Sequence, residues 1–537
     1  MNELTVQLAW NRLLAMVEEQ AQVLMRTAFS TVVREAGDLS AGVFDIQGRM
    51  LAQAVTGTPG HVNSMADAVA KFLKQFPADE MSEGDVLLTN DPWDGTGHLN
   101  DFTVVTPVFW KSRCVAFFAS TSHIADVGGR GFGPDANDIY EEGLRIPISK
   151  LFDQGERNET LMQLLAANVR DAAVAEGDLY SLTACNDAGA RDLKGLLEDL
   201  ELDDLVELSE IIITRSHGAM LEELARLPAG QYRYSMTVDG YDEPVLLNAE
   251  MTISSTRISI DFGGSAAASP KGINVPLPYT QAYASFGVRC VVGNEVPNNA
   301  GSLSVIQVSA PEGCILNARM PRAVSARHAI GQMLPDVVLG CLDQAVPGRI
   351  PVEGASCIWN PVFLNEVGSR EQFVINPIFN GGTGARPGKD GLSTTAFPSG
   401  VRTTSIEVNE ATSPLVFWQR EYTPDSGGKG EYRGGLGQTI NISHSSGEAF
   451  VVSKMFDRIR HPARGRAGGE DGAPGAVFVT DAQGVEMPLA GKGRDIVPAD
   501  TRLTLRTPGG GGLGDAATRA TAHQSSDVES GLVSRSD

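Results

Sequence analysis

The chain has 537 residues, and at roughly 150 residues per domain this length predicts about three or four domains. Its 43 lysine and arginine residues against 66 aspartate and glutamate residues give a net charge of −23. A strongly acidic surface repels phosphate backbones and anionic headgroups, so this charge argues against nucleic acid and against a membrane as a partner. The 42% of hydrophobic residues excludes a wholly disordered chain.

Cysteine and glycine usage narrow the class further. The six cysteines are far apart and form no Cys-x-x-Cys pair, which excludes a thiolate zinc ribbon and fits a reducing, cytoplasmic location. The first residues are not basic, and no apolar run reaches about 18 residues, so we expect neither a signal peptide nor a membrane span. The 59 glycines, roughly 11% against about 7% on average, predict tight turns or close backbone approaches.

The first part of the chain alternates helical and strand patterns. Apolar residues at helical spacing predict an amphipathic helix over the first thirty residues. Five further elements follow in chain order: a hairpin over 41–53, a strand over 85–89, a polar glycine-rich loop over 90–101, and two strands over 102–110 and 114–121 that flank a turn. After a second glycine-rich loop, residues 155–225 have a helical pattern, with the acidic run 197–210 predicted as one solvated helix.

The remaining chain is richer in strands. Alternating patterns predict strands over 232–238, 245–253 and 258–262, and beyond about 350 the chain is dense in glycine. The fold class is therefore α+β (mixed α/β) and multidomain, helical with β-hairpins in its N-terminal part and β-rich in its C-terminal half. We expect an N-terminal domain with the candidate metal site over 1–228, a mixed α/β domain over 229–349, a glycine-rich β domain over 350–515, and a disordered tail over 516–537.

Two of the eight histidines lie in polar loops, each three residues before a carboxylate: His98 before Asp101 and His123 before Asp126. If the two strands after the first loop form a hairpin, position 123 lies opposite roughly position 100 or 101. The hairpin then brings His123 beside His98 and Asp101. Two imidazoles and a carboxylate suit Zn, Mn, Fe or another divalent ion. The carboxylates of Asp91 and Asp126 lie nearby in the sequence.

Other polar residues have a structural explanation. Asp38 follows Gly37 beyond the first helix, and this pattern alone is that of a helix C-terminal cap and turn. His328 precedes an apolar helix, which favours a structural role, and His461 lies in a basic island, which favours a local salt bridge. The sequence has no phosphate-binding loop, dinucleotide fingerprint or nucleophile elbow.

Several motifs, in this order, resemble the hydantoinase B/oxoprolinase family over nearly the whole chain up to Asp515. They are Arg34-Glu35-x-x-Asp38-x-Ser40, Asn90-Asp91-Pro92 with His98-x-x-Asp101, His123-x-x-Asp126-x-Gly128-Gly129, Glu142-Gly143-Leu144-Arg145-Ile146-Pro147, Gly381-Gly382-x-Gly384-Ala385-Arg386, Asp425-Ser426-Gly427-Gly428, Tyr432-Arg433-Gly434-Gly435 and Thr507-Pro508-Gly509-Gly510-Gly511-Gly512. Many relatives have proline where Asn100 stands and a second histidine where Ser122 stands. These departures leave the candidate ligand positions in place and bear on the substrate.

The resemblance implies the B-type subunit of an ATP-dependent cyclic-amide hydrolase of the hydantoinase, 5-oxoprolinase or lactamase type. It implies that a separate hydantoinase A-type subunit binds ATP, with an α2β2 heterotetramer as the expected assembly. It also implies a divalent metal, Zn, Mn or Fe, with His98, Asp101 and His123 as ligands and Asp38 as the fourth.

The hypothesis for the reaction follows from the poor reactivity of cyclic amides. ATP would activate the carbonyl by phosphorylation in the partner subunit, and water on the metal would then open the ring. Asp126 or Asp91 would orient a ligand imidazole or accept the proton of that water.

Two alternatives stay open at this point. The related acetone and acetophenone carboxylases make an ATP-dependent ketone carboxylase subunit the first alternative, which dependence on bicarbonate would reveal. A non-catalytic structural subunit is the second, and it predicts that the purified chain holds no tightly bound metal.

Overall fold

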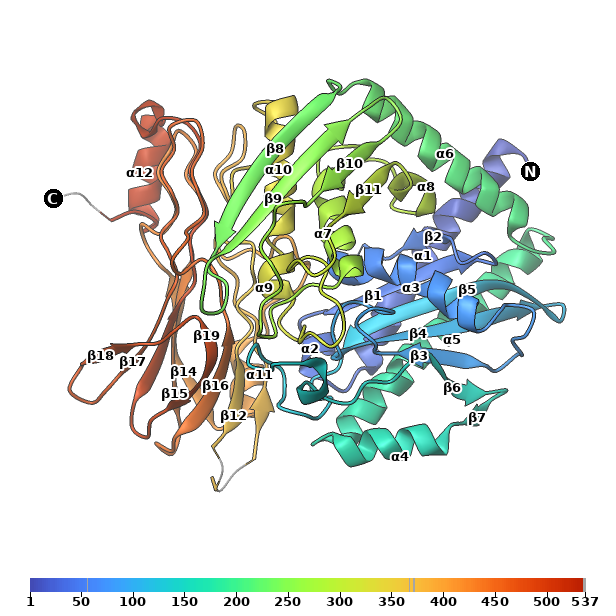
Figure 1. Cartoon of the computed structure of the whole chain (residues 1–537), viewed down its shortest axis with the longest axis horizontal. Coiled ribbons are helices and arrows are strands. Elements are labelled where there is room, and N and C mark those ends of the chain that lie inside the picture. Colours follow the sequence, from blue (N-terminus) through green and yellow to red (C-terminus); the bar gives the residue numbers. More distant parts are fainter. Residues whose placement is uncertain (56, 367, 370–371, 535–537) are drawn as a thin grey trace.

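The computed structural model describes residues 1–55, 57–366, 368–369 and 372–534. Helices and several separate sheets are mixed along the chain, as the predicted fold class requires. Figure 1 shows the N-terminal sheet (blue) and the C-terminal sheets (orange and red) on opposite sides of the molecule, with the middle segment (green and yellow) between them. No helix in these described ranges is long and apolar enough to cross a membrane.

The N-terminal sheet has seven strands in the order β2-β1-β5-β4-β3-β6-β7, and all of its neighbouring strands are antiparallel. Its strands are β1 (Leu39–Asp45), β2 (Met50–Gln53), β3 (Val86–Thr89), β4 (Asp101–Trp110), β5 (Arg113–His123), β6 (Ser149–Asp153) and β7 (Glu156–Arg157). The hairpin and the three strands predicted in this region are confirmed. A two-residue turn joins β4 to β5, and both of its residues, Lys111 and Ser112, have positive φ, as tight hairpin turns require.

Helices bury both faces of this sheet, which is why its central strands are apolar nearly throughout. The predicted first helix, α1 (Glu3–Thr27), packs with α5 (Ala172–Asp199) on one face, and α3 (Pro59–Gln75) packs on the other. Along β5, Phe118 belongs to the first core and Phe117 to the second. The other elements here are α2 (Thr31–Arg34), η1 (Ile139–Glu141), α4 (Glu159–Asn168) and α6 (Val206–Ala225).

The acidic run 197–210 is not one helix, contrary to the prediction. The helix α5 ends at Asp199, and α6 begins only at Val206. Glu201 has a φ of 52°, which a continuing α-helix does not allow, and Leu205 is buried in the core next to α1. Burial of Leu205 therefore places the connection between α5 and α6 against the core.

The middle segment forms a four-stranded sheet in the order β11-β10-β9-β8, and its three predicted strands are confirmed. Its elements are β8 (Gly230–Val238), β9 (Val245–Ile253), β10 (Ile258–Asp261), α7 (Leu277–Arg289), α8 (Ala300–Leu303), β11 (Ile306–Ser309), α9 (His328–Gly331) and α10 (Leu334–Ala345). Burial alternates along β9, and its inward side packs against α10 (Figure 1).

Two further sheets make up the β-rich C-terminal half, in the orders β13-β12-β16-β19 and β14-β15-β20-β17-β18. Their elements are β12 (Val362–Asn365), β13 (Val374–Ile375), α11 (Ile406–Ala411), β14 (Leu415–Tyr422), β15 (Gln438–His444), β16 (Phe450–Met455), β17 (Ala476–Thr480), β18 (Glu486–Pro488), β19 (Lys492–Val497) and β20 (Arg502–Arg506). One aromatic core joins them, in which Trp359 stacks on Phe456 at 4.2 Å between ring centroids.

The glycine-rich motifs of this half form a bundle of extended segments, 381–385, 426–437, 463–473 and 508–513, which we call the glycine bundle. Backbone hydrogen bonds join its segments: Gly510 N–H donates to the carbonyl of Gly435, and Gly435 N–H donates to that of Thr383. A Cβ on Gly434 would lie 1.9 Å from the carbonyl oxygen of Gly510. The glycine content predicted either tight turns or close approaches between backbone segments, and this region has the close approaches.

The chain end differs from the predicted disordered tail. Over residues 516–534 it forms η2 (Ala516–Thr518) and α12 (Thr521–Glu529). Arg519 donates to both carboxylate oxygens of Asp390 at 2.8 Å and to Asp527 at 2.7 Å, and Asp527 also pairs with Arg433. These buried ion pairs hold a polar segment against the glycine bundle. The proposed domain boundaries stay predictions.

Candidate metal centre

The candidate ligands converge because three strands meet at one end of the N-terminal sheet. Asp101, the first residue of β4, is the direct antiparallel partner of His123, the last residue of β5. The predicted register of this hairpin is therefore confirmed. Strand β1 begins beside them, so the backbone N–H of His123 lies 3.3 Å from the carbonyl oxygen of Asp38.

Asp101 is the centre of a fully buried polar cluster. Its Oδ1 lies 2.6 Å from Nε2 of His98 and 3.3 Å from Nδ1 of His123. Its Oδ2 lies 2.9 Å from Nε2 of His61 and also accepts a hydrogen bond from the guanidinium of Arg327. Three imidazoles and one guanidinium thus share a single carboxylate that is only 1% exposed.

The donor set of this cluster fits a divalent metal ion. Within the described ranges, His98, Asp101 and His123 form the one group of three or more potential ligands whose donor atoms all lie within 4.8 Å of each other. Nδ1 of His98 lies 2.9 Å from the carbonyl oxygen of Ser325, a contact that orients this ring with Nε2 toward Asp101. Nε2 of His123 and Nδ1 of His61 are buried with no hydrogen-bond partner. Imidazole and carboxylate donors suit Zn, Mn or Fe.

Electrostatics keep two of these ligands in the protonation state that metal binding needs. Burial, reinforced by the charge of Arg327, lowers the pKa of His98 to about 4, so the ring is neutral at neutral pH. Burial raises the pKa of Asp101, but His61, His98 and Arg327 outweigh it and hold that pKa well below its usual range. Metal ligands have to be deprotonated, and both groups meet this condition.

Asp38 lies at the edge of the cluster. It lines the same cavity, its Oδ1 accepts a hydrogen bond of 2.9 Å from the hydroxyl of Thr58, and the same oxygen lies 3.7 Å from Nδ1 of His61. The cap prediction also holds, because Gly37 has a φ of 68° and its N–H donates to the carbonyl of Val33. One local motif thus ends a helix and points a carboxylate at the cluster.

The structure does not bring Asp91 or Asp126 into the cluster, and neither lines the cavity. Asp91 accepts from the backbone N–H of Trp93 and pairs with Arg145 at 3.1 Å. Asp126 accepts from the backbone N–H of Gly128 and pairs with Arg170. Both carboxylates therefore organise the glycine-rich loops around the site.

Three residues that line this cavity were not identified as site residues from the sequence. His61 lies in the first turn of α3, and no local motif marks it. Arg327 and His328 come from the start of α9, more than 200 residues from Asp101. Arg327 also donates to the carbonyl of Thr96 at 2.8 Å, and its guanidinium carbon lies 4.1 Å from the centre of the Tyr279 ring.

His328, interpreted from the sequence as structural, lines the same cavity and has a buried Nε2 with no hydrogen-bond partner. His461 pairs with a carboxylate as predicted, but the pair is not local: its Nδ1 lies 2.9 Å from Asp239, 222 residues earlier in the chain.

The cavity around the cluster is small, about 30 Å³. A volume of this size is of the order of one or two water molecules, so it suits an ion with a bound water and is small for a five-membered ring. Its walls come from all three parts of the chain; the non-polar ones are Val32, Phe132, Ile358, Ile378 and Val401. A ring-shaped substrate therefore reaches the cluster only after a wall residue moves.

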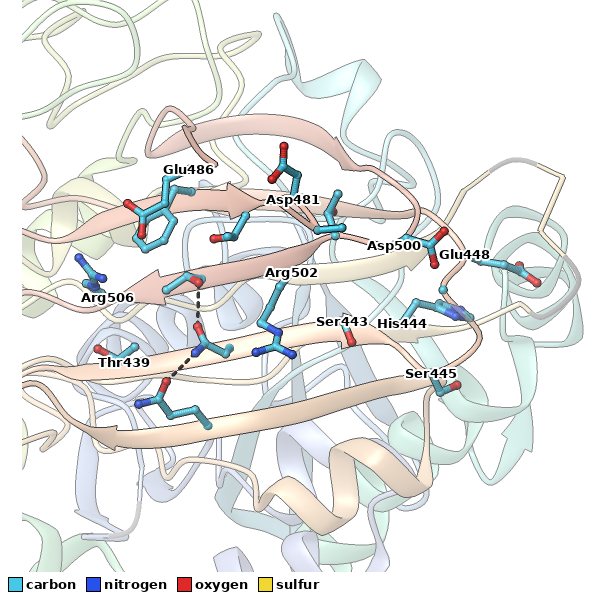
Figure 2. Close-up of a pocket in the computed structure, with 18 of the residues that line it drawn as sticks. Thr439, Ser443, His444, Ser445, Glu448, Asp481, Glu486, Asp500, Arg502 and Arg506 are labelled. Carbon is cyan, nitrogen blue, oxygen red and sulfur yellow. Dashed lines mark hydrogen bonds between the residues drawn. The ribbon is translucent and has the colours of Figure 1, made fainter. Parts of the chain in front are cut away.

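A much larger hollow lies elsewhere, on the outer face of the five-stranded C-terminal sheet, with a volume of about 1060 Å³. Figure 2 shows that its labelled side chains are polar and carry both signs of charge, with Arg502 and Arg506 near Asp481, Glu486 and Asp500. It shares no lining residue with the cavity around Asp101. The volume of a cavity therefore does not by itself identify the candidate functional site.

The comparisons with known proteins agree with this geometry. The sequence model of the Hydantoinase B/oxoprolinase family matches residues 2–516. Caprolactamase subunit beta of Pseudomonas jessenii is 29% identical over 96% of this chain and 91% of its own length. The crystal structure of the ATP-dependent caprolactamase from this organism superposes with a TM-score of 0.90 at 25% identity, covering 99% of this chain and 95% of that one.

Two further relatives differ in length or function. 5-Oxoprolinase 1 of Arabidopsis thaliana is 29% identical over 94% of this chain, which spans only 41% of that protein. A nucleotide-free structure of acetone carboxylase superposes with a TM-score of 0.87 over 99% of this chain and 78% of that one, at 18% identity. The last likeness concerns the fold alone.

Proposed function

Because the chain belongs to the hydantoinase B/oxoprolinase family, we propose that it is the metal-containing subunit of an ATP-dependent hydrolase that opens cyclic amides such as lactams or hydantoins. The observation that carries the proposal is the buried cluster in which three imidazoles surround Asp101, with unpaired ring nitrogens on His61 and His123. A purely structural cluster would leave few such atoms unpaired, because each costs about 1–3 kcal/mol.

A second subunit completes the proposed enzyme. The sequence has no phosphate-binding loop, its caprolactamase relative is named as a beta subunit, and the chain spans 41% of a 5-oxoprolinase. We assign ATP binding and phosphorylation of the amide oxygen to a hydantoinase A-type partner, in an α2β2 assembly. The activated amide then passes to the cluster in this chain.

Each residue of the cluster has a distinct part in the proposed mechanism. Asp38, His98, Asp101 and His123 would hold a divalent ion, Zn, Mn or Fe, which supplies a nucleophilic water near neutral pH. The carbonyl of Ser325 orients His98, and Arg327 binds Oδ2 of Asp101, which leaves Oδ1 directed at His98 and His123.

His61 replaces Asp91 and Asp126 as the proposed proton acceptor. Its Nδ1 is unpaired, lines the cavity and lies 3.7 Å from Oδ1 of Asp38. Burial lowers the pKa of His61, but the carboxylates of Asp101 and Asp38 outweigh this effect and raise it. A ring held between two carboxylates is well placed to take a proton from the attacking water.

The test compares His123→Ala with His523→Ala, which changes an exposed histidine in α12. Each variant is co-expressed with the A-type partner, and bound metal is counted by mass spectrometry. ATP-dependent ring opening is assayed with hydantoin, 5-oxoproline and caprolactam. We expect His123→Ala to lose both metal and ring opening and His523→Ala to keep both. Full metal content and full ring opening in His123→Ala would refute the proposal.

The same protein preparations distinguish the proposed function from its two alternatives. The acetone carboxylase fold makes a ketone carboxylase the second candidate. Consumption of ATP that requires bicarbonate and a ketone, with no ring opening, would identify it. A complex in which this chain holds no metal while ring opening proceeds would identify a structural subunit.

A further inference from the structure

A second cavity lies beside the first, and Phe132 lines both of them. Its volume is about 80 Å³. Its non-polar lining comes from Phe132 and from the C-terminal strands β12 and β13, through Val362, Leu364 and Val374. Its cationic lining comes from three different parts of the chain: Arg130 after β5, Arg170 between α4 and α5, and Arg494 on β19.

The three arginines differ in how far they are neutralised. Arg130 pairs with Glu141 at 3.2 Å, and Arg170 pairs with Asp126. Arg494 is exposed, and across the described residues no hydrogen-bond or ion-pair partner contacts its guanidinium. Burial lowers the pKa of Arg494, and the charges of Arg170 and Arg130 lower it further, against the opposing effect of Asp135.

Two carboxylates also line this cavity, and each already has a donor. Asp126 is held by Arg170, and Oδ1 of Asp135 accepts a hydrogen bond of 2.5 Å from the hydroxyl of Tyr241. Because Glu141 neutralises Arg130 and Asp126 neutralises Arg170, Arg494 is the cation of this lining that has no ion-pair partner among the described residues. In a chain of net charge −23, a locally cationic site of this kind attracts small anions from solution.

Phe132 is the wall between this cavity and the cluster. Its ring centroid lies 5.0 Å from that of His123, 5.6 Å from that of His98 and 5.8 Å from that of His328. It stands between Gly131, whose φ is 82°, and Gly133. The glycine at 131 lets the backbone next to this ring adopt a conformation that other residues resist.

We propose that the arginine-lined cavity is the entrance to the cluster, and that Arg494, with Arg130 and Arg170, binds the carboxylate or phosphate group of an incoming cyclic amide or of its phosphorylated form. This inference rests on the function proposed above. The volume of 80 Å³ is that of about three waters, which suits one anionic group. Guanidinium is the side-chain group best matched to carboxylate and phosphate.

The test measures binding by calorimetry on the full chain, using Arg494→Gln and, as control, Arg226→Gln, which changes another exposed arginine, at the end of α6. The probes are inorganic phosphate, 5-oxoproline and 2-pyrrolidinone, the last having the same ring as 5-oxoproline without the carboxylate. We expect Arg494→Gln to weaken binding of phosphate or 5-oxoproline about tenfold or more, and to leave 2-pyrrolidinone unchanged. Loss of phosphate binding alone identifies the phosphorylated form as the ligand, and loss of 5-oxoproline binding alone identifies a substrate carboxylate.

Equal affinities of wild type and Arg494→Gln for both anions, or no binding of either anion to the wild type, would overturn the inference. As a second measurement that needs no variant, phosphate is expected to slow modification of Arg494 by phenylglyoxal; unchanged modification would count against it. Metal content is measured in the same samples. A wild-type chain that holds no metal yet discriminates between the probes would refute the proposed function and leave the anion site standing.

Discussion

Replacing Asp101 by asparagine tests whether its charge, rather than its shape, holds the cluster together. Asparagine keeps the size of the side chain and one oxygen, but it carries no charge to neutralise Arg327. Removing one partner of a buried ion pair costs about 3–5 kcal/mol, because the other charge is left uncompensated. Arg327 retains the carbonyl of Thr96 and the ring of Tyr279. The loss expected for Asp101→Asn is therefore at the lower end, about 3 kcal/mol.

Asp199→Asn is the matched control. Asp199 pairs with Arg12 at 2.8 Å, but its side chain is 64% exposed, and such surface pairs contribute about 0–1 kcal/mol. Because a chain of several domains does not unfold in one step, urea unfolding is combined with hydrogen exchange of the amides in β4 and β5. We expect faster exchange there in Asp101→Asn only, together with loss of bound metal. Equal effects of the two substitutions would show that burial of Asp101 has no energetic consequence.

Three further predictions concern stability. Burial raises the pKa of Glu142 to about 8, above its unfolded value of about 4.3, so its contribution to stability is present at low pH and lost as pH rises toward 8. Glu142→Gln should remove this decline, and urea unfolding series from pH 5 to 8 that run parallel for both proteins would contradict it. Gly434→Ala places a methyl group against the carbonyl of Gly510 and should lower the free energy of unfolding by about 1–3 kcal/mol or more. Gly195→Ala fills open space in α5 and should raise it by about 0.5–1 kcal/mol. Thermal unfolding distinguishes the two effects. Asp527→Asn removes the anion between Arg433 and Arg519 and should speed proteolysis within 516–534; an unchanged rate of cleavage would show that these ion pairs do not hold α12 in place.

The pairing of Asp101 with His123 could be predicted because it depends on a local hairpin. Two strands of known start and end, joined by a short turn, leave little freedom in register, and Lys111 and Ser112 adopt the turn that matches the twist of the strands. Asp38 was predicted as a ligand only through the family resemblance, because the local pattern Gly37-Asp38 indicates a helix cap and turn.

The other partners of Asp101 could not be predicted from local pattern. His61 lies on α3, which packs on the face of the sheet opposite to α1, and Arg327 lies at the start of α9 in the middle segment. Neither is marked by spacing or by a turn, because their positions depend on how whole elements dock. The prediction for residues 516–534 differed from the structure for a related reason. Their polar composition suggested disorder, but Arg519 pairs with Asp390, which lies 129 residues away in the sequence.

The glycine bundle has a consequence for how this protein responds to temperature. Unfolding of an apolar core raises the heat capacity by about 0.45 cal/K/mol per Å² of newly wetted surface, while exposure of polar groups lowers it by about 0.26. The bundle has backbone amides where other cores have side chains, and its segments are joined by backbone hydrogen bonds. Its unfolding therefore carries a small heat-capacity change, and its stability curve is flat. On cooling, the aromatic and aliphatic cores of the molecule weaken, whereas the hydrogen-bonded glycine segments keep their strength.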